Sequence, residues 1–168
     1  TLQIDTLHML TSDGEIRLPQ ITTPGGRLGQ DLPIWQERFL TGNTDTVYVS
    51  VFLDLKKDGP MVIEVPPVTG PGSVHDAFFR FVIDTGPPGP DQGKGGKYLI
   101  LPPDMVALQG DVPEGYHVVK STSWVNWFIA RGFLKDGKPD FSSKLFREGL
   151  KIYPLSMAAN PPETEFFN

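Results

Sequence analysis

Cysteine is absent from this chain of 168 residues. Disulfides, thiolate nucleophiles and cysteine-ligated metal sites are therefore excluded. No apolar run approaches the roughly 20 residues that a helix needs to cross a bilayer, so the sequence predicts no membrane span. The first residue is Thr1 rather than Met, and no secretory signal pattern follows it. We therefore expect the chain to be trimmed, cleaved or cut from a longer protein.

Clusters of basic residues are also missing, since no more than two Lys or Arg residues are adjacent and the net charge is −5. A surface that neutralises phosphates is not expected, which argues against nucleic acid as a partner. Glycine (18 residues) and proline (17 residues) are abundant, and no repeat period accompanies them. This composition excludes a collagen-like chain and indicates many turns between short strands.

Short strand-like segments dominate the chain. The clearest is 46–55, where β-branched and aromatic residues prevail. Segment 61–65 follows it after a Lys-Lys-Asp-Gly-Pro turn and is predicted to be its hairpin partner. The Gly/Pro flanks of segment 74–84 favour one strand there. Further strands are predicted at 15–18, 98–101, 116–120, 124–130 and 151–155.

One short helix is predicted at 140–149, in the C-terminal third, with Asp140 as its N-cap and Gly149 closing its C-terminus. About eight strands and one helix predict a mainly β fold, an antiparallel β-sandwich or jelly roll. We expect a strand and loop segment at 1–38, one sandwich domain at 39–158, and a linker-like or edge tail at 159–168.

Three blocks of sequence carry a resemblance to a known family. They are Phe-Leu-Thr-Gly-Asn-Thr-Asp-Thr-Val-Tyr (39–48), Gly-Lys-Gly-Gly-Lys-Tyr (93–98) and Ile-Tyr-Pro-Leu-Ser (152–156). Over about residues 39–166 the chain resembles domain-of-unknown-function family 1254. Asn160-Pro161-Pro162 is similar to the linker that precedes a second domain, of unknown-function family 1214, in such proteins.

The resemblance implies a mainly β, jelly-roll-like fold and a bacterial-type, often exported protein, periplasmic or secreted. It also implies a second domain that follows covalently or has been cleaved off. It implies no activity. The helical segment expected ahead of Asn43 and the second domain are both missing from this sequence.

The glycine-rich segment 89–97 could present backbone N–H groups and the ammonium groups of Lys94 and Lys97 to an anion. It is not a Walker A loop, because Tyr98 begins a strand where that motif needs Ser or Thr and a helix. The other interpretation is a structural turn whose lysines are solvated or pair with Asp91.

Asn43, Asp45, Thr46 and Tyr48 form a polar group at the entrance of the 46–55 strand. A period of two places Thr46 and Tyr48 on one face, opposite the valines at positions 47 and 49. These polar side chains could form the rim of a ligand cleft, or an Asx-type turn that fixes the start of the strand.

Arg80 and Arg131 both lie inside apolar runs. A buried arginine needs a partner. Structural ion pairs are one interpretation, and a bidentate clamp on a ligand carboxylate is the other. The candidate partners are Asp54, Asp76 and Asp84.

The histidines at positions 8, 75 and 117 could build a metal site with Asp76, of the kind that jelly rolls host. They lack His-x-His spacing, so we expect each to lie alone and expect no metal or other cofactor. Aromatic side chains could stack on sugars or pack in the core: Trp35, Tyr48, Phe79, Tyr116, Trp124 and Trp127. Asn126 needs a polar partner if it is buried.

Three functions stay open. The first is a non-catalytic binding domain for a small polar ligand or glycan. The second is a hydrolase or lyase that uses an Asp/Arg pair or a His-bound metal, suggested by Asp76, Arg80 and Asp84 beside His75; no serine-nucleophile motif is present. The third is a structural domain that packs on a missing partner through Trp124, Trp127, Phe166 and Phe167. The candidate ligand-binding residues are Asn43, Asp45, Tyr48, Arg80, Asp84, Lys94, Lys97 and Arg131.

Overall fold

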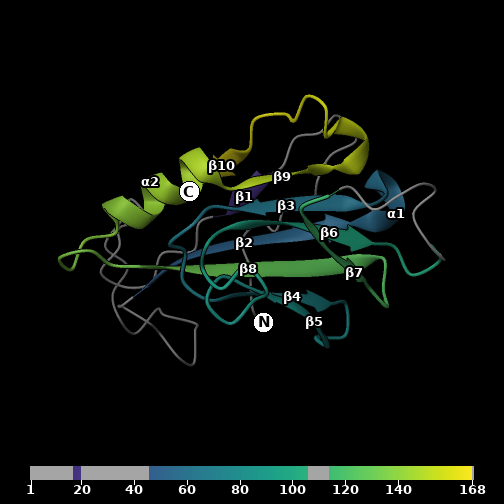
Figure 1. Ribbon diagram of the computed structural model, residues 1–168, viewed down its shortest axis with the longest axis horizontal. Coiled ribbons are helices and arrows are strands. Elements are labelled where there is room, and N and C mark those ends of the chain that lie inside the picture. The colour runs from purple at the N-terminus through teal and green to yellow at the C-terminus, as the bar shows by residue number, and fades with distance from the viewer. Residues whose placement is uncertain (1–16, 20–45, 106–113, 168) are drawn as a thin grey trace, which may run out of the picture.

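Two four-stranded sheets form the body of the protein in the computed structural model, which describes residues 17–19, 46–105 and 114–167 (Figure 1). The first sheet has the order β2-β8-β4-β5 and is antiparallel. The second has the order β7-β6-β3-β9 and is mixed, because β6 and β7 run parallel. The described part of the chain is therefore mainly β, as predicted.

The strands of the first sheet are β2 (Thr46–Asp54), β8 (Val125–Phe133), β4 (Gly72–Asp76) and β5 (Phe81–Thr85). Those of the second are β7 (Tyr116–Lys120), β6 (Gly96–Leu101), β3 (Met61–Val65) and β9 (Lys151–Pro154). The helical elements are α1 (Leu55–Asp58), α2 (Asp140–Gly149) and the 3-10 turn η2 (Leu155–Met157).

The core lies between the two sheets. Along β2 the residues alternate, so that Val49 and Val51 are buried while Tyr48 and Phe52 are half-buried on the opposite face. This confirms the predicted period of two. The inward residues of both sheets form one apolar cluster, which includes Val74 and Phe128 from the first sheet and Met61, Ile63, Tyr98 and Ile152 from the second.

The predicted hairpin between 46–55 and 61–65 is wrong. β2 pairs with β8 along its whole length, and β3 pairs with β6 and β9 in the other sheet. The connecting residues form the helical turn α1, and the Asp54 carboxylate accepts hydrogen bonds from the backbone N–H groups of Lys56 (3.0 Å) and Lys57 (3.2 Å). A capped helical turn carries the chain from one sheet to the other, whereas a tight β-turn would keep it in the same sheet.

The single strand predicted at 74–84 is two strands. β4 and β5 form an antiparallel hairpin, and residues 77–80 form its turn. The pairing register shifts between Val74 and His75, which marks a β-bulge. The apolar composition concealed this turn, because its aromatic residues are also typical of strands.

Helix α2 begins and ends where the sequence predicts, but its caps differ. Pro139 occupies the N-cap position without a side-chain hydrogen bond, and Asp140 lies in the first turn. The last turn closes through the Leu150 N–H, which donates to the Phe146 carbonyl (3.0 Å). Gly149 is required by a contact instead, since a Cβ there would lie 2.6 Å from Cβ of Pro66.

The strands at the two ends of the chain pair with each other. β1 (Arg17–Pro19) lies parallel to β10 (Glu165–Phe167), with Arg17 opposite Glu165. Residues 165–167 of the tail therefore form a short strand beside β1. No helix within the described ranges is long and apolar enough to cross a membrane.

Two phenylalanines on β8 test this layering. Phe128 is fully buried, so Phe128→Ala should lower the free energy of unfolding by about 3–5 kcal/mol. Phe133 is 55% exposed, so Phe133→Ala should lower it by less than about 1 kcal/mol. Urea denaturation measures both values, and equal losses would contradict the assignment of inner and outer faces.

Candidate functional site

The carboxylate of Asp76 closes the β4–β5 hairpin. Its Oδ1 accepts hydrogen bonds from the backbone N–H groups of Phe78 and Arg80 (both 2.9 Å). Its Oδ2 accepts from Nε of Arg80 (2.7 Å) and from the hydroxyl of Thr122 (2.6 Å). The Asp76 side chain is fully inaccessible to solvent. Burial by itself would raise its pKa, but these four donors outweigh it and hold the pKa well below the ordinary value of 3.8.

The hairpin turn presents aromatic rings to solvent. Phe78 is 73% exposed, Phe79 69% and Phe81 65%. The guanidinium of Arg80 lies 5.0 Å from the centroid of the Phe78 ring. Three large apolar side chains within four residues are thus exposed to solvent, and such clusters mark candidate interaction sites.

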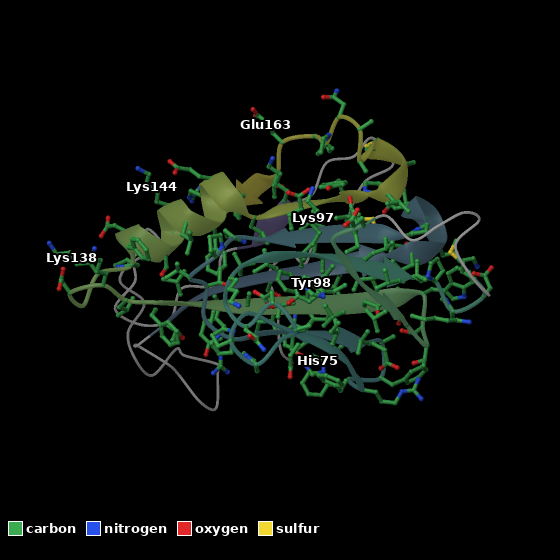
Figure 2. The ribbon with its side chains drawn as sticks, in the orientation of Figure 1. His75, Lys97, Tyr98, Lys138, Lys144 and Glu163 are labelled. Atoms are coloured by element: carbon green, nitrogen blue, oxygen red, sulfur yellow. The ribbon has the colours of Figure 1, made fainter. Side chains whose placement is uncertain are left out.

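A stack of aromatic rings continues from the hairpin across the outer face of the first sheet. The register places Phe52, Trp127 and His75 side by side on β2, β8 and β4. The ring of Phe79 lies 4.7 Å from that of His75, at an interplanar angle of 8°, and 5.6 Å from that of Trp127. The rings of Phe52 and Trp127 are 6.4 Å apart. Figure 2 shows His75 on the lower side of the molecule, on the opposite side from Lys97 and Lys144.

Polar side chains border this stack. Nε1 of Trp127 donates to the hydroxyl of Ser50 (2.7 Å). Ser73 lies two residues before His75 on β4, and Asp84 is opposite Ser73 on β5. The Ser73 hydroxyl and Nδ1 of His75 are buried and have no hydrogen-bond partner. Two polar atoms that form no hydrogen bond within the fold therefore lie beside the exposed aromatic rings.

Tyr48 and Arg131 lie farther along the same face. They are opposite each other in the β2–β8 register, and the Arg131 guanidinium is 5.2 Å from the Tyr48 ring centroid. Arg131 lies four residues along β8 from Trp127, which separates them by about 13 Å. Tyr48, Arg131 and the aromatic stack therefore lie on one face of the sheet. Arg80 and Arg131 lie toward opposite ends of that face.

Neither arginine is buried, contrary to the expectation from their apolar neighbours. The Arg80 side chain is 59% exposed and pairs with Asp76, and Arg131 is exposed. Exposure removes the requirement for a partner that burial would impose. Asn43 and Asp45, the other residues proposed for this rim, lie outside the described residues.

The glycine-rich loop is held in place by the carboxylate of one of its own residues, Asp91. The carboxylate of Asp91 accepts hydrogen bonds from the Gly95 N–H (3.1 Å) and from the buried hydroxyl of Tyr98. Burial and the neighbouring Asp91 raise the pKa of Tyr98 above its ordinary value. The loop is also tied to its neighbour by the Val68 N–H, which donates to the Gly93 carbonyl (3.0 Å). These contacts favour the structural interpretation of the loop, with Lys94 exposed to solvent.

Lys97 lies on the outer face of the second sheet, away from the aromatic stack (Figure 2). Its ammonium group is 2.8 Å from a carboxylate oxygen of Glu64, which also accepts a hydrogen bond from the Tyr153 hydroxyl. Burial would raise the pKa of Glu64, but the hydrogen bonds from Lys97 and Tyr153 lower it. Hydrogen bonding to Glu64 raises the pKa of Lys97. Lys97 therefore forms a structural ion pair with Glu64.

The histidines and carboxylates considered for a metal site or for catalysis do not lie close together in the described part of the chain. His75 is on the first sheet and His117 on the second, while His8 and Trp35 lie outside the described residues. Within the described ranges, no three His, Asp or Glu side chains are placed to hold a metal ion. Asp76, as a hydrogen-bonded carboxylate of low pKa, is unsuited to general acid or base catalysis near neutral pH.

The remaining polar and aromatic candidates have structural roles. Asn126 is buried and satisfied, because Oδ1 accepts from Ser121 (2.6 Å) and Nδ2 donates to the Ser123 carbonyl (3.2 Å). Trp124 packs against the core. Phe166 packs against the core and lies 5.7 Å from the guanidinium of Arg147.

Sequence reasoning missed Phe78 and Phe81 as exposed residues. A signal was present: Asp76 and Arg80, spaced four residues apart, can close a tight turn between them.

The family model described as "Protein of unknown function (DUF1254)" matches residues 30–154. The chain therefore belongs to this family, as the resemblance predicted. The comparison with curated proteins found no match. The fold is similar to the crystal structure of the VPA0106 protein from Vibrio parahaemolyticus, with a TM-score of 0.58 and 19% sequence identity. That match covers 75% of this chain and 32% of the other, so this chain corresponds to about a third of that protein's length.

Removing the Tyr98 hydroxyl should loosen the glycine-rich loop. Tyr98→Phe leaves the buried Asp91 carboxylate without one of its donors, which should lower the free energy of unfolding by about 1–3 kcal/mol. Lys94→Ala, an exposed change in the same loop, should alter it by less than about 0.5 kcal/mol. Urea denaturation tests both, and a neutral Tyr98→Phe would contradict the proposed anchoring.

The Asp76 carboxylate should make stability depend on pH in acid. Its pKa is lowered by folding, so its contribution is fully present above the unfolded value near 3.8 and is lost as the pH falls toward the folded value. Asp76→Asn should destabilise the protein at pH 7 and flatten the loss of stability below about pH 4. Melting temperatures across pH 2–7 measure this, and parallel curves for both proteins would contradict it.

Proposed function

We propose that this chain is a non-catalytic binding domain that holds a glycan on the outer face of the first sheet. The observation that carries the proposal is the exposed phenylalanine hairpin, whose Phe79 ring continues into a stack with His75 and Trp127. Sugars have apolar C–H faces and polar edges, so a site for them combines aromatic rings with hydrogen-bonding side chains. Both kinds of group lie together on this face.

Burial of the aromatic surface would supply the favourable free energy. Removal of apolar surface from water contributes about 25 cal/mol per Å², and the hydrogen bonds to Asp76 already hold the backbone of the turn that carries Phe78 and Phe79. A rigid contact surface loses little conformational entropy when a ligand binds. The hairpin is therefore prepared for recognition before the ligand arrives.

The polar neighbours would supply specificity. Asp84 can accept hydrogen bonds from sugar hydroxyls, and Arg80 and Arg131 can donate to them. The carboxylate of Asp84 and the net charge of −5 disfavour an anionic lipid surface as the occupant.

The enzyme alternative has less support. The Asp76–Arg80 pair suggested by the sequence is occupied in closing the hairpin. The packing alternative, which the sequence placed on Trp124, Trp127, Phe166 and Phe167, has less support because Trp124 and Phe166 pack against the core of this same domain. A glycan is favoured because hydrogen-bonding groups border the rings. A glycan ligand also agrees with export of the protein from the cell, and that export stays a prediction.

Isothermal titration calorimetry with soluble hexasaccharides tests the proposal. We expect the wild type to bind at least one of cellohexaose, chitohexaose and maltohexaose, and Phe79→Ala to weaken that binding at least about tenfold, the effect of losing about 1.4 kcal/mol. Phe141→Ala is the matched control, because Phe141 is 43% exposed on α2, outside the aromatic stack. Absence of binding to all three, or equal losses in both variants, would contradict the proposal.

A further inference from the structure

Phe79 has a backbone conformation that is unfavourable for its residue type. Its φ is +62°, in the left-handed region that favours glycine. The Asp76 carbonyl accepts a hydrogen bond from the Phe79 N–H (3.0 Å), and the Asp76 carboxylate holds the N–H groups on either side of it. Glycine or asparagine would be easier to accommodate here.

The Phe79 ring stays largely exposed although it stacks on two neighbouring rings. It is 69% exposed, and its contacts are with the half-buried rings of His75 and Trp127. A ring that served only packing would be expected to be buried. Unfavourable backbone geometry at an exposed aromatic residue is typical of a binding position.

We infer that Phe79 is the residue on which a sugar ring stacks, and that Asp76 is the positioning residue that holds it there. This inference rests on the proposed function and deepens it by naming the ligand class. The ring can contact a sugar face to face only if that face carries no axial oxygen. An α-1,4-linked glucose keeps one such face and a β-1,4-linked glucose keeps both, so we take the ligand class to be a glycan with equatorial linkages, such as a β-1,4-linked glucan.

A chain fits better than a single sugar, because three exposed rings lie within four residues of the hairpin. Phe78 and Phe81 lie within two residues of Phe79 and are exposed to a similar degree. Asp84 lies farther along β5, where it can meet the hydroxyls at the edge of the chain. Neighbouring sugars on one chain bind with a high effective concentration, which offsets the weakness of each shallow contact.

The variant Phe79→Gly separates function from folding. It relieves the left-handed backbone but loses the stacking on His75 and Trp127, and because these effects offset each other its melting temperature should stay close to that of the wild type. Phe79→Ala removes the ring but keeps a Cβ in the left-handed region, so it should melt about 2–4 °C below Phe79→Gly. Both variants should lose affinity for cellohexaose by at least about tenfold.

Val68 provides the matched control. It also has a positive φ (+69°) and is 67% exposed, but it lies in the loop between β3 and β4, outside the aromatic stack. Val68→Gly should raise the melting temperature and leave cellohexaose binding unchanged. Maltohexaose, in which an axial C1 oxygen blocks one face of each sugar, should bind the wild type at least about tenfold more weakly than cellohexaose.

The outcomes distinguish this inference from the proposed function. If the wild type binds a hexasaccharide and Phe79→Gly binds it equally well, the role of Phe79 is overturned while the binding domain stands. Preference for maltohexaose would overturn the equatorial ligand class alone. If Phe79→Gly melts well below the wild type, the ring serves folding and the inference fails. If no hexasaccharide binds the wild type, the proposed function and this inference both fail.

Discussion

The buried carboxylate of Asp76 is the interaction on which the exposed face of the first sheet depends. It joins the hairpin turn to Thr122, which precedes β8, through four hydrogen bonds. A buried charge is tolerated only when it is paired and hydrogen-bonded, and here three of the four donors belong to the hairpin turn and the fourth to Thr122. The positions of Phe78, Phe79 and Arg80 follow from this single group.

The outer faces of the two sheets differ in how far their apolar side chains are covered. On the second sheet, Val62, Leu99 and Tyr153 are buried, and Met105 and Leu155 pack against them. On the first sheet, the phenylalanines of the hairpin stay exposed. The chain thus covers apolar residues on one outer face and leaves aromatic rings in contact with solvent on the other. This asymmetry is what directs the functional interpretation to the first sheet.

Much of the fold could be predicted from local patterns. The bounds of β3, β7 and α2 were predicted correctly, because alternation and helix-forming residues act within a few positions. The pairing of β2 with β8 could not be predicted, because it depends on contacts between residues far apart in the chain. Among the candidate ligand-binding residues, Tyr48 and Arg131 are neighbours on the first sheet. Lys97 lies on the second sheet and forms an ion pair with Glu64 there, so it does not belong to the same site. The turn at Phe79 was hidden by its strand-like composition, since the hydrogen bonds that the Asp76 carboxylate accepts from the turn override strand propensity.

The most direct measurement is a ¹H–¹⁵N correlation spectrum of the ¹⁵N-labelled chain during titration with cellohexaose. If the outer face of the first sheet binds the glycan, the shifts should concentrate at the backbone amides of Phe78, Phe79 and Arg80 and at the indole N–H of Trp127. The amides of the Gly93–Gly95 loop and of Lys97 should not move. Shifts confined to that loop or to the second sheet, or no shifts at millimolar ligand, would contradict the account.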